Sequence, residues 1–586
     1  SLTSTLCISI ASAVLVGCAA SSPQKAPAAA ALPKGGDATA LTLTAETDLK
    51  RGDCRSASEN YARAAALGNA QLARRATQVA MACEHLPAAS QASSRWRTLS
   101  PADPEANALY AAVALKQYRT ADGRAAIRDF WHAEQLQSSA AASPSTPPAA
   151  GAANKPPAPR TTDRAAASLT ELTALLLEES DPSAVLSAMS GALEPTANSA
   201  ATFTLLGELA LAGYDGQRAE RYAKQALQYD PKDTGALKVL ARAYVMRGDA
   251  AQAIATAREV AALDPTRGGF ELAEILAALD RTEEAHEELE RLRGHGASQV
   301  EVDRRLALLA YDSGDMQEAK QRFQELVANG EGNDAAQLYL ADIAARQGDV
   351  DTALSGYRRL YDSSVALSAR SRAAALLLDR RSRTEALALL DDYAADHPEE
   401  ELDLTLAKAR LLADHGEPDT SLALLGAELE RHPQHPSIEY DRAVTLEQAG
   451  QVHESVEAFE QMLAGRPEDP TLMNALGYTL ADHTLELPHA EGLIKRALTV
   501  TPDNPAALDS LGWVHYRQGD AKGAAGTLQR AYSLGHDPEI AAHWGETLWV
   551  SGDQNDARKV WAAALAREPD SKQLKATVKR FVPDAH

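Results

Sequence analysis

The chain has 586 residues, of which 45% are hydrophobic and only 5% are aromatic, and its formal net charge is −23. This length exceeds what one compact core accommodates and favours several domains or a repeat array. The negative charge disfavours nucleic acids and anionic lipid surfaces as partners, because both bind clustered Lys and Arg. Alanine recurs throughout and no long alternation of apolar and polar residues occurs, so we expect an almost entirely α-helical protein.

The first segment is typical of an export signal. Residues 6–17 form an apolar run that is too short to span a bilayer, and the run is followed directly by Cys18 in the sequence Leu-Val-Gly-Cys. This ending resembles the lipobox of bacterial lipoproteins, which implies cleavage before Cys18 and attachment of lipid to its thiol. We therefore predict a lipoprotein signal peptide over residues 1–17. The alternative is an ordinary signal peptide that contains a cysteine by chance.

Residues 18–40 are small, polar and proline-bearing, which predicts a flexible tether between a lipid anchor and the folded body. Several acyl chains on one residue would hold the protein stably on a membrane. Ala19 and Ala20 follow Cys18, with no Asp beside the cysteine. By resemblance to enterobacterial sorting rules, this indicates an outer-membrane lipoprotein whose body faces the periplasm.

A small residue recurs every 32–35 residues through the central and C-terminal parts of the chain. Its positions are Ala219, Ala253, Ala285, Ala319, Ala353, Ala386, Ser421, Ser455, Ala490, Ala524 and Ala557. A small side chain there lets two antiparallel helices approach closely. Gly-Asp recurs between the two helices, as at Gly248-Asp249. The glycine can end one helix in the left-handed conformation, and the aspartate can cap the next.

This period and these turn residues match the tetratricopeptide pattern, in which a unit of about 34 residues forms two antiparallel helices. We predict an all-α fold, a right-handed tetratricopeptide superhelix (α-solenoid), with about eleven repeats over residues 201–570. Residues 163–200 are predicted to form a helical cap, and residues 571–586 a C-terminal helix.

A smaller N-terminal helical domain is predicted over residues 41–137, where the same repeat pattern occurs in degenerate form. A Pro- and Ala-rich linker over residues 138–162 separates this domain from the main array. Cys54 would follow one helix turn, and Cys83 would end the first helix of the next unit, at the same edge of a stacked solenoid. We predict a Cys54–Cys83 disulfide; two buried free thiols are the alternative.

No motif for catalysis is recognisable. The sequence lacks a phosphate-binding glycine loop, an HExxH zinc pattern and a nucleophile elbow, and its fifteen histidines are scattered. We expect no catalytic residue, no metal site and no cofactor other than the covalent lipid on Cys18. The expected partners are proteins, with a membrane contact through the lipid and no nucleic acid.

The expected binding surface is the groove that the first helix of each unit lines in tetratricopeptide proteins. Placing that pattern on the last units selects Asn474, Tyr478, Asp509, Trp513, Tyr516, Glu546 and Trp549. Aromatic residues on a partly exposed surface are typical interface anchors. For Trp513 and Trp549 the alternative is a place in the core, where we also expect Trp561 and Trp544.

Three C-terminal stretches carry a more specific resemblance. They are NALGYTLADHT (474–484), LDSLGWVHYRQGD (508–520) and DPEIAAHWGETLW (537–549). They resemble a proteobacterial group of long tetratricopeptide lipoproteins that includes the outer-membrane adaptor of a periplasmic carboxyl-terminal processing protease. The resemblance implies a non-catalytic scaffold that binds this protease and presents peptidoglycan hydrolases for degradation. The alternative is a structural scaffold of an exopolysaccharide, pilus or outer-membrane assembly machine.

Overall fold

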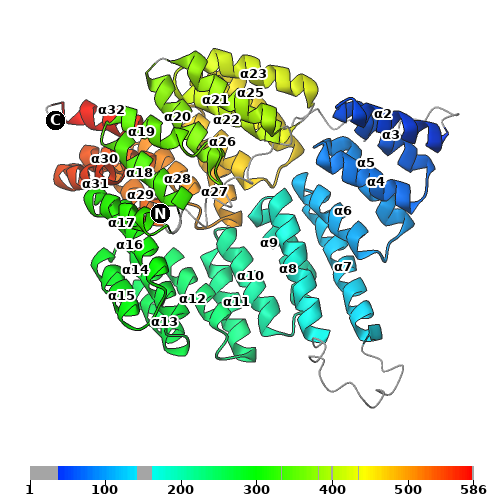
Figure 1. The fold of residues 1–586 in the computed structure, drawn as a ribbon, viewed down its shortest axis with the longest axis horizontal. Coiled ribbons are helices and arrows are strands. Elements are labelled where there is room, and N and C mark those ends of the chain that lie inside the picture. Colours follow the sequence, from blue (N-terminus) through cyan, green and yellow to red (C-terminus); the bar gives the residue numbers. More distant parts are fainter. Residues whose placement is uncertain are drawn as a thin grey trace.

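The computed structural model describes residues 37–141, 161–330, 333–380, 382–397, 400–432 and 435–583. Within these ranges every regular element is a helix and no strand occurs. Consecutive helices pack as antiparallel pairs that stack along the chain and curve into a superhelix (Figure 1). The predicted all-α solenoid is confirmed. The predicted signal peptide, Cys18 and most of the tether lie outside the described residues.

The N-terminal part of the structure contains three helix pairs followed by a two-helix connection. The pairs are α2 (Ala38–Lys50) with α3 (Cys54–Leu67), α4 (Ala70–Ala82) with α5 (Leu86–Leu99), and α6 (Pro104–Lys116) with α7 (Thr120–Ala141). The connection is α8 (Thr161–Glu179) and α9 (Pro182–Leu193), with a short 3₁₀ helix, η1 (Glu194–Thr196). Helices α7 and α8 extend into both ends of the linker predicted over 138–162, as far as Ala141 and from Thr161.

Eleven consecutive pairs follow within the described residues. The first six are α10 (Ala200–Ala212) and α11 (Gly216–Tyr229), α12 (Thr234–Met246) and α13 (Ala250–Leu263), α14 (Arg267–Ala278) and α15 (Thr282–Gly294), α16 (Gln299–Ser313) and α17 (Met316–Ala328), α18 (Asn333–Arg346) and α19 (Val350–Arg358), and α20 (Ala366–Asp379) and α21 (Arg383–Asp396). The last five are α22 (Glu401–Asp414) and α23 (Pro418–Arg431), α24 (Pro436–Gln448) and α25 (Val452–Gly465), α26 (Pro470–Asp482) and α27 (Leu487–Val500), α28 (Pro505–Arg517) and α29 (Ala521–Gly535), and α30 (Pro538–Ser551) and α31 (Gln554–Arg567). Helix α32 (Lys572–Phe581) closes the array.

The small residue of each unit lies where the two helices of a pair cross. All eleven of these alanines and serines, from Ala219 to Ala557, have zero exposed surface. One turn later on the same helix face a large side chain fills the space between units, as Phe459 and Trp561 do. The regular spacing of small residues in the sequence therefore reflects the close approach of the two helix backbones in each pair.

The turns that carry Gly-Asp follow the expected chemistry at four of the five main-array units with this dipeptide. Gly248 has φ +77°, and the side chain of Asp249 accepts a hydrogen bond from the Gln252 amide at the start of α13. The exception is Asp553, whose side chain makes no capping hydrogen bond to α31.

One glycine is fixed by close packing inside a helix. A Cβ built on Gly545 of α30 would lie 2.1 Å from Nε1 of Trp561, whereas a Cβ on Gly526 of α29 would meet nothing within 4 Å. We expect Gly545→Ala to lower the free energy of unfolding by about 1–3 kcal/mol, because the indole must shift. The matched change Gly526→Ala is expected to raise it by up to about 1 kcal/mol through helix propensity alone. Urea unfolding of both variants tests this, and equal effects would contradict it.

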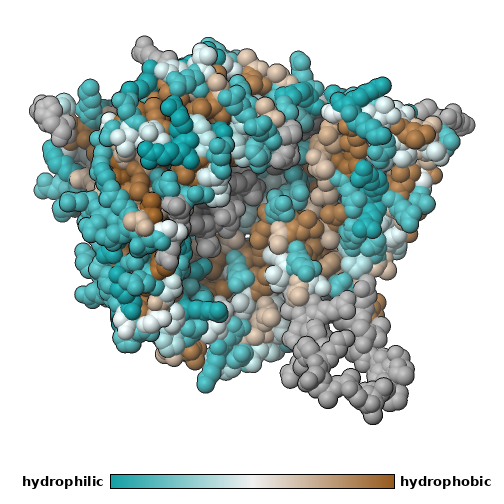
Figure 2. Space-filling model, viewed as in Figure 1, coloured by the Kyte–Doolittle hydropathy of each residue, from teal (hydrophilic) through white to brown (hydrophobic). Residues whose placement is uncertain are grey.

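The surface carries many polar residues on the face that Figure 2 shows. Figure 2 shows hydrophilic residues over most of one face, with an apolar area around α9 and α10. No helix among the described residues has both the length and the apolar character needed to cross a membrane.

Candidate protein-binding groove

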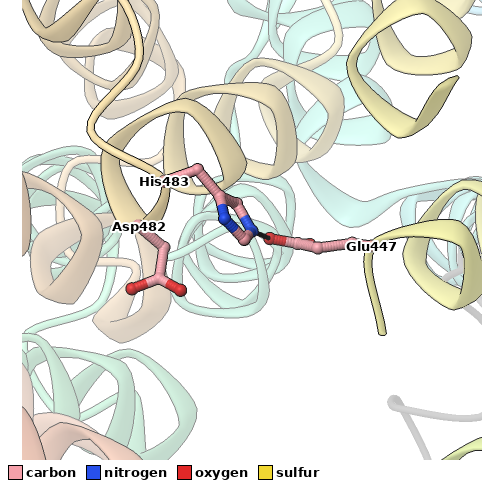
Figure 3. Close-up of side chains that lie close together, drawn as sticks. All are labelled: Glu447, Asp482 and His483. Carbon is pink, nitrogen blue, oxygen red and sulfur yellow. Dashed lines mark hydrogen bonds and ion pairs between the residues drawn. The ribbon is translucent and has the colours of Figure 1, made fainter. Parts of the chain in front are cut away.

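The first helices of the last units are joined side by side by polar contacts. Between α24 and α26, the Glu447 carboxylate accepts hydrogen bonds from Thr479 Oγ1 (3.1 Å) and His483 Nε2 (3.2 Å). Figure 3 shows the Glu447–His483 pair, with Asp482 to one side of it. The ligand-type atoms of Glu447, Asp482 and His483 lie within 4.8 Å of one another, which is a spacing that a metal ion could use.

Protein donors already account for this cluster. Asp482 Oδ1 accepts a hydrogen bond from Trp513 Nε1 of α28 (3.0 Å), and Arg517 of the same helix lies 3.5 Å from that oxygen. The carboxylate of Glu447 is likewise paired with α26, and burial raises its pKa. We therefore assign the cluster to the pairing of α24, α26 and α28 with one another.

The next contact along the array is a buried ion pair. Asp509 of α28 and His543 of α30 are each 5% exposed, and His543 Nδ1 lies 3.0 Å from Asp509 Oδ2. The Trp513 ring stacks on the His543 ring with centroids 4.0 Å apart. Beside them, Tyr478 of α26 donates its hydroxyl hydrogen to Glu539 of α30 (2.7 Å). Three first helices are thus held together by one polar and aromatic cluster.

The contacts continue to the last helix. Tyr516 of α28 donates to Glu546 of α30 (2.9 Å), and Arg580 of α32 forms an ion pair with the same carboxylate. Trp549 is half-buried and stacks on Trp561, with ring centroids 5.7 Å apart. We call the contacts from Glu447 through Asp482, Asp509 and Glu539 to Glu546 the polar wall.

The polar wall shifts the pKa of several of its own groups. Burial alone would lower the pKa of His543, but the carboxylates around it, Asp509 foremost and then Glu539 and Asp482, together raise it. Burial, reinforced by Glu546, raises the pKa of Tyr516 to about 12. Burial and Glu539 raise the pKa of Tyr478 well above its usual range. These acids and hydroxyls serve each other as partners, so the wall is a preorganised surface rather than a set of free charges.

The structure brings most of the predicted groove residues together. Six of the seven lie in the polar wall or against it, namely Tyr478, Asp509, Trp513, Tyr516, Glu546 and Trp549. Asn474 lies on the same first helix as Tyr478, and its Oδ1 atom is buried with no hydrogen-bond partner among the described residues. Trp513 differs from the expectation of an open anchor. It is only 5% exposed, and the rings of His543 and Tyr516 both stack against it.

Sequence reasoning missed the partners that complete this wall, which are Glu447, Asp482, His543, Glu539 and Arg580. Each lies at about the unit length or twice that length from its partner, as Asp509 and His543 do at 34 residues. A search for polar and aromatic residues repeating at the unit length, instead of small residues alone, would have found them.

The structure joins the two N-terminal cysteines predicted to pair. Cys54 is the first residue of α3, Cys83 directly follows α4, and their Cα atoms lie 5.4 Å apart across a disulfide. The bond fastens the first helix pair to the second. It therefore acts within the N-terminal domain and not at the groove.

Comparisons with known proteins agree with the repeat fold. Residues 210–269 match one tetratricopeptide repeat model, and residues 304–369, 406–482 and 486–538 match another. A curated relative, the TPR repeat-containing protein PA4667 of Pseudomonas aeruginosa, is 32% identical over 213 residues. The match covers 36% of this chain and 36% of the relative, so the chain matches about a third of that protein's length.

Two solved structures resemble parts of the array. The first is a thermophilic TPR protein from Thermus thermophilus, with 24% sequence identity and a TM-score of 0.29. The match covers 30% of this chain and 97% of the Thermus chain. MamA from Desulfovibrio magneticus is 17% identical and covers 29% of this chain and 96% of its own, with a TM-score of 0.24. The matched segments, which together make up less than half of the chain, carry tetratricopeptide repeats, and repeats of this kind indicate a protein-binding scaffold.

Proposed function

We propose that this chain is an outer-membrane lipoprotein adaptor. In this proposal it binds a periplasmic carboxyl-terminal processing protease and presents peptidoglycan hydrolases to it for degradation. The lipid on Cys18 anchors it, and residues 18–40 give the folded body reach. The chain itself catalyses nothing and needs no cofactor other than the lipid.

One observation carries the proposal. The three stretches that resemble the adaptor group occupy α26, α28 and α30, and these are the helices that the polar wall joins. The resemblance therefore falls on one continuous set of adjacent helices. Several of their polar-wall side chains are buried, as Asp509 and Trp513 are, so a partner would contact the half-buried residues along this surface. Half-buried aromatic rings at the end of this surface, Tyr516 and Trp549, suit an interface anchor.

The mechanism that follows is proximity. A solenoid of this length offers separate surfaces, so a protease on one and a hydrolase on another would share one tethered molecule. The second encounter becomes intramolecular, and its effective concentration rises to about the millimolar range for a short flexible connection. Turnover of the hydrolase would then increase without any new chemistry in the adaptor.

Affinity capture tests this proposal. We would use the chain from Ala19 onward, without lipid, as bait in a detergent-solubilised envelope extract, and identify retained proteins by mass spectrometry. We expect a carboxyl-terminal processing protease together with cell-wall hydrolases, and faster hydrolase cleavage by that protease when the bait is added. Retention of polymer-export or pilus subunits without a protease would reject the adaptor role in favour of an assembly scaffold.

A pair of variants localises the contact. We expect Trp549→Ala to reduce protease capture at least about tenfold, which corresponds to about 1.4 kcal/mol of binding free energy. Tyr229→Ala is the matched control, because Tyr229 is an exposed aromatic residue (54%) at the far end of α11 in the first unit of the array. Thermal unfolding of both variants shows whether the fold is retained. Equal capture by both variants would contradict a contact at the polar wall.

A further inference from the structure

The superhelix meets itself along one edge. The early units are those from α4 to α20, and the late units are those from α24 to α32. Loops within the early helix pairs face loops that precede the first helices of the late units, and α16 touches α31 (Figure 1). The contacts are Glu84–His435, Tyr118–Arg466, Gly216–Asp503, Asp280–His536, Asp280–Arg567, Arg346–Glu568 and Asp379–Lys572. Hydrogen-bonded partners in this set lie 193 to 351 residues apart in the chain. We call this set the inter-turn seam.

Polar and charged groups make up the seam. Every apolar cluster among the described residues draws its members from neighbouring units, and none combines early and late units. Hydrophobic burial therefore stabilises each stretch of the array separately and does not hold one superhelical turn against the next. The charged groups of the seam differ in burial. Asp280 and Asp379 are exposed, whereas His435, Arg466 and Asp503 are buried. Exposed ion pairs are individually weak and are screened by salt, and the buried contacts are screened less.

At the centre of the seam, Asp503 from a late unit caps the start of helix α11 in an early unit. The Gly216 amide, the first of α11, donates to Asp503 Oδ2 at 2.9 Å, and the Asp503 amide donates to the Tyr214 carbonyl at 2.9 Å. The first amides of a helix have no acceptor within that helix, so Asp503 satisfies a group that would otherwise face water. A Cβ at position 216 would lie 3.0 Å from the Asp503 carboxylate, so a glycine there leaves room for the approach.

A second part of the seam brings one carboxylate together with two basic side chains. Asp280, in the turn between α14 and α15, accepts from His536 Nε2 at 3.1 Å and from Arg567 Nη2 at 2.5 Å. Burial alone would raise the pKa of Asp280, but these two partners bring it to about 2. Asp280 therefore stays charged across the ordinary pH range and pairs early with late units throughout it.

We propose that the seam is an electrostatic clasp, which holds the superhelical turns together and lets them separate as intact bodies when its charges are screened or taken by a partner. Separation needs no loss of apolar core, because each cluster lies wholly on one side of the seam. The width of the superhelix, and access to surfaces between its turns, would then respond to ionic strength and to charged proteins. This device is independent of which partner the polar wall binds.

Amide exchange of the unaltered protein tests the clasp directly. Salt is raised from about 0.05 M to about 1 M, over which the screening length falls to a few ångströms. We expect exchange of the Gly216 amide to accelerate at least about tenfold and the radius of gyration from X-ray scattering to increase. The Ala250 amide is the internal control, because it begins α13 in the same way and no described residue across the seam accepts from it. Unchanged Gly216 exchange and an unchanged radius would overturn the proposal.

Two variants distinguish the effect of losing a seam charge from the effect of losing a charge elsewhere. Asp280→Asn keeps the shape of the side chain and removes its charge from the seam, whereas Asp249→Asn makes the same change at the preceding unit, where Asp249 caps only its own helix. We expect Asp280→Asn at low salt to reproduce the faster Gly216 exchange and larger radius, and Asp249→Asn to leave both as in the parent. Equal behaviour of the two variants would overturn the clasp. If Asp280→Asn loses its helical circular dichroism, the salt series on the parent protein decides.

Discussion

Replacing Asp509 with alanine is expected to lower the free energy of unfolding of the C-terminal units by about 3–5 kcal/mol. The reason is that His543 would remain buried, at 5% exposure, without the carboxylate that now lies 3.0 Å from its Nδ1 atom. An unpaired buried charge costs far more than an exposed ion pair contributes. Urea unfolding followed by tryptophan fluorescence measures the change, because Trp513 stacks on His543.

The control removes both charges at once. We expect Asp509→Leu combined with His543→Phe to recover most of the lost stability, since an apolar pair of similar size needs no partner and the phenyl ring keeps a face for Trp513. Similar losses in the single and double variants would show that packing, and not an unpaired charge, dominates at this site.

The same pair predicts a dependence on pH. Asp509 raises the folded-state pKa of His543 above 6.5, the ordinary value, although burial opposes the shift. A raised pKa means that the stabilising contribution is fully present below about pH 6.5 and is lost as pH rises through the folded value. We therefore expect the parent protein to lose stability relative to the double variant as the pH rises above about 6.5. A constant difference between the two across that range would contradict this assignment.

The repeat register could be read from the sequence because its cause is local. A helix pair can cross closely only over a small side chain, so each unit needs one at the same place, and all eleven predicted positions are fully buried. The turn chemistry is equally local, as Asp249 shows by capping the helix that it precedes. Neither feature depends on how the solenoid curves.

The environment of Trp513 could not be read in the same way. Its burial depends on His543, which is supplied by the next unit, and on how closely two first helices approach. A groove-lining and a buried tryptophan occupy the same position within one unit, so the pattern alone left both alternatives open. The seam is even harder to predict from the sequence. Contacts such as Glu84–His435 depend on the pitch of the superhelix, which is the sum of small rotations between many successive units.

The N-terminal domain should depend strongly on its disulfide. Cys54 and Cys83 are 29 residues apart, and closing a loop of that size restricts the unfolded chain by about 3–4 kcal/mol. We expect Cys54→Ser with Cys83→Ser to lower the unfolding free energy of α2–α5 by this amount. Because units in a solenoid interact mainly with their neighbours, the loss should appear as an earlier first step in thermal unfolding, with the C-terminal step unchanged.

This effect should also reach the seam. Cys83 directly precedes Glu84, whose carboxylate accepts a hydrogen bond from His435 at 2.9 Å, so the disulfide fixes the turn that carries the first seam contact. A reductant should act on the parent protein as the double substitution does, and should have no effect on the variant that lacks both thiols. Two reactive thiols in the denatured, unreduced chain from Ala19 onward would contradict the bond. If the first unfolding transition moves to lower temperature while the exchange rate of the Gly216 amide is unchanged, the disulfide stabilises only the N-terminal helix pairs. If Gly216 exchange also becomes faster, the stability of the N-terminal pairs controls whether the superhelical turns stay in contact.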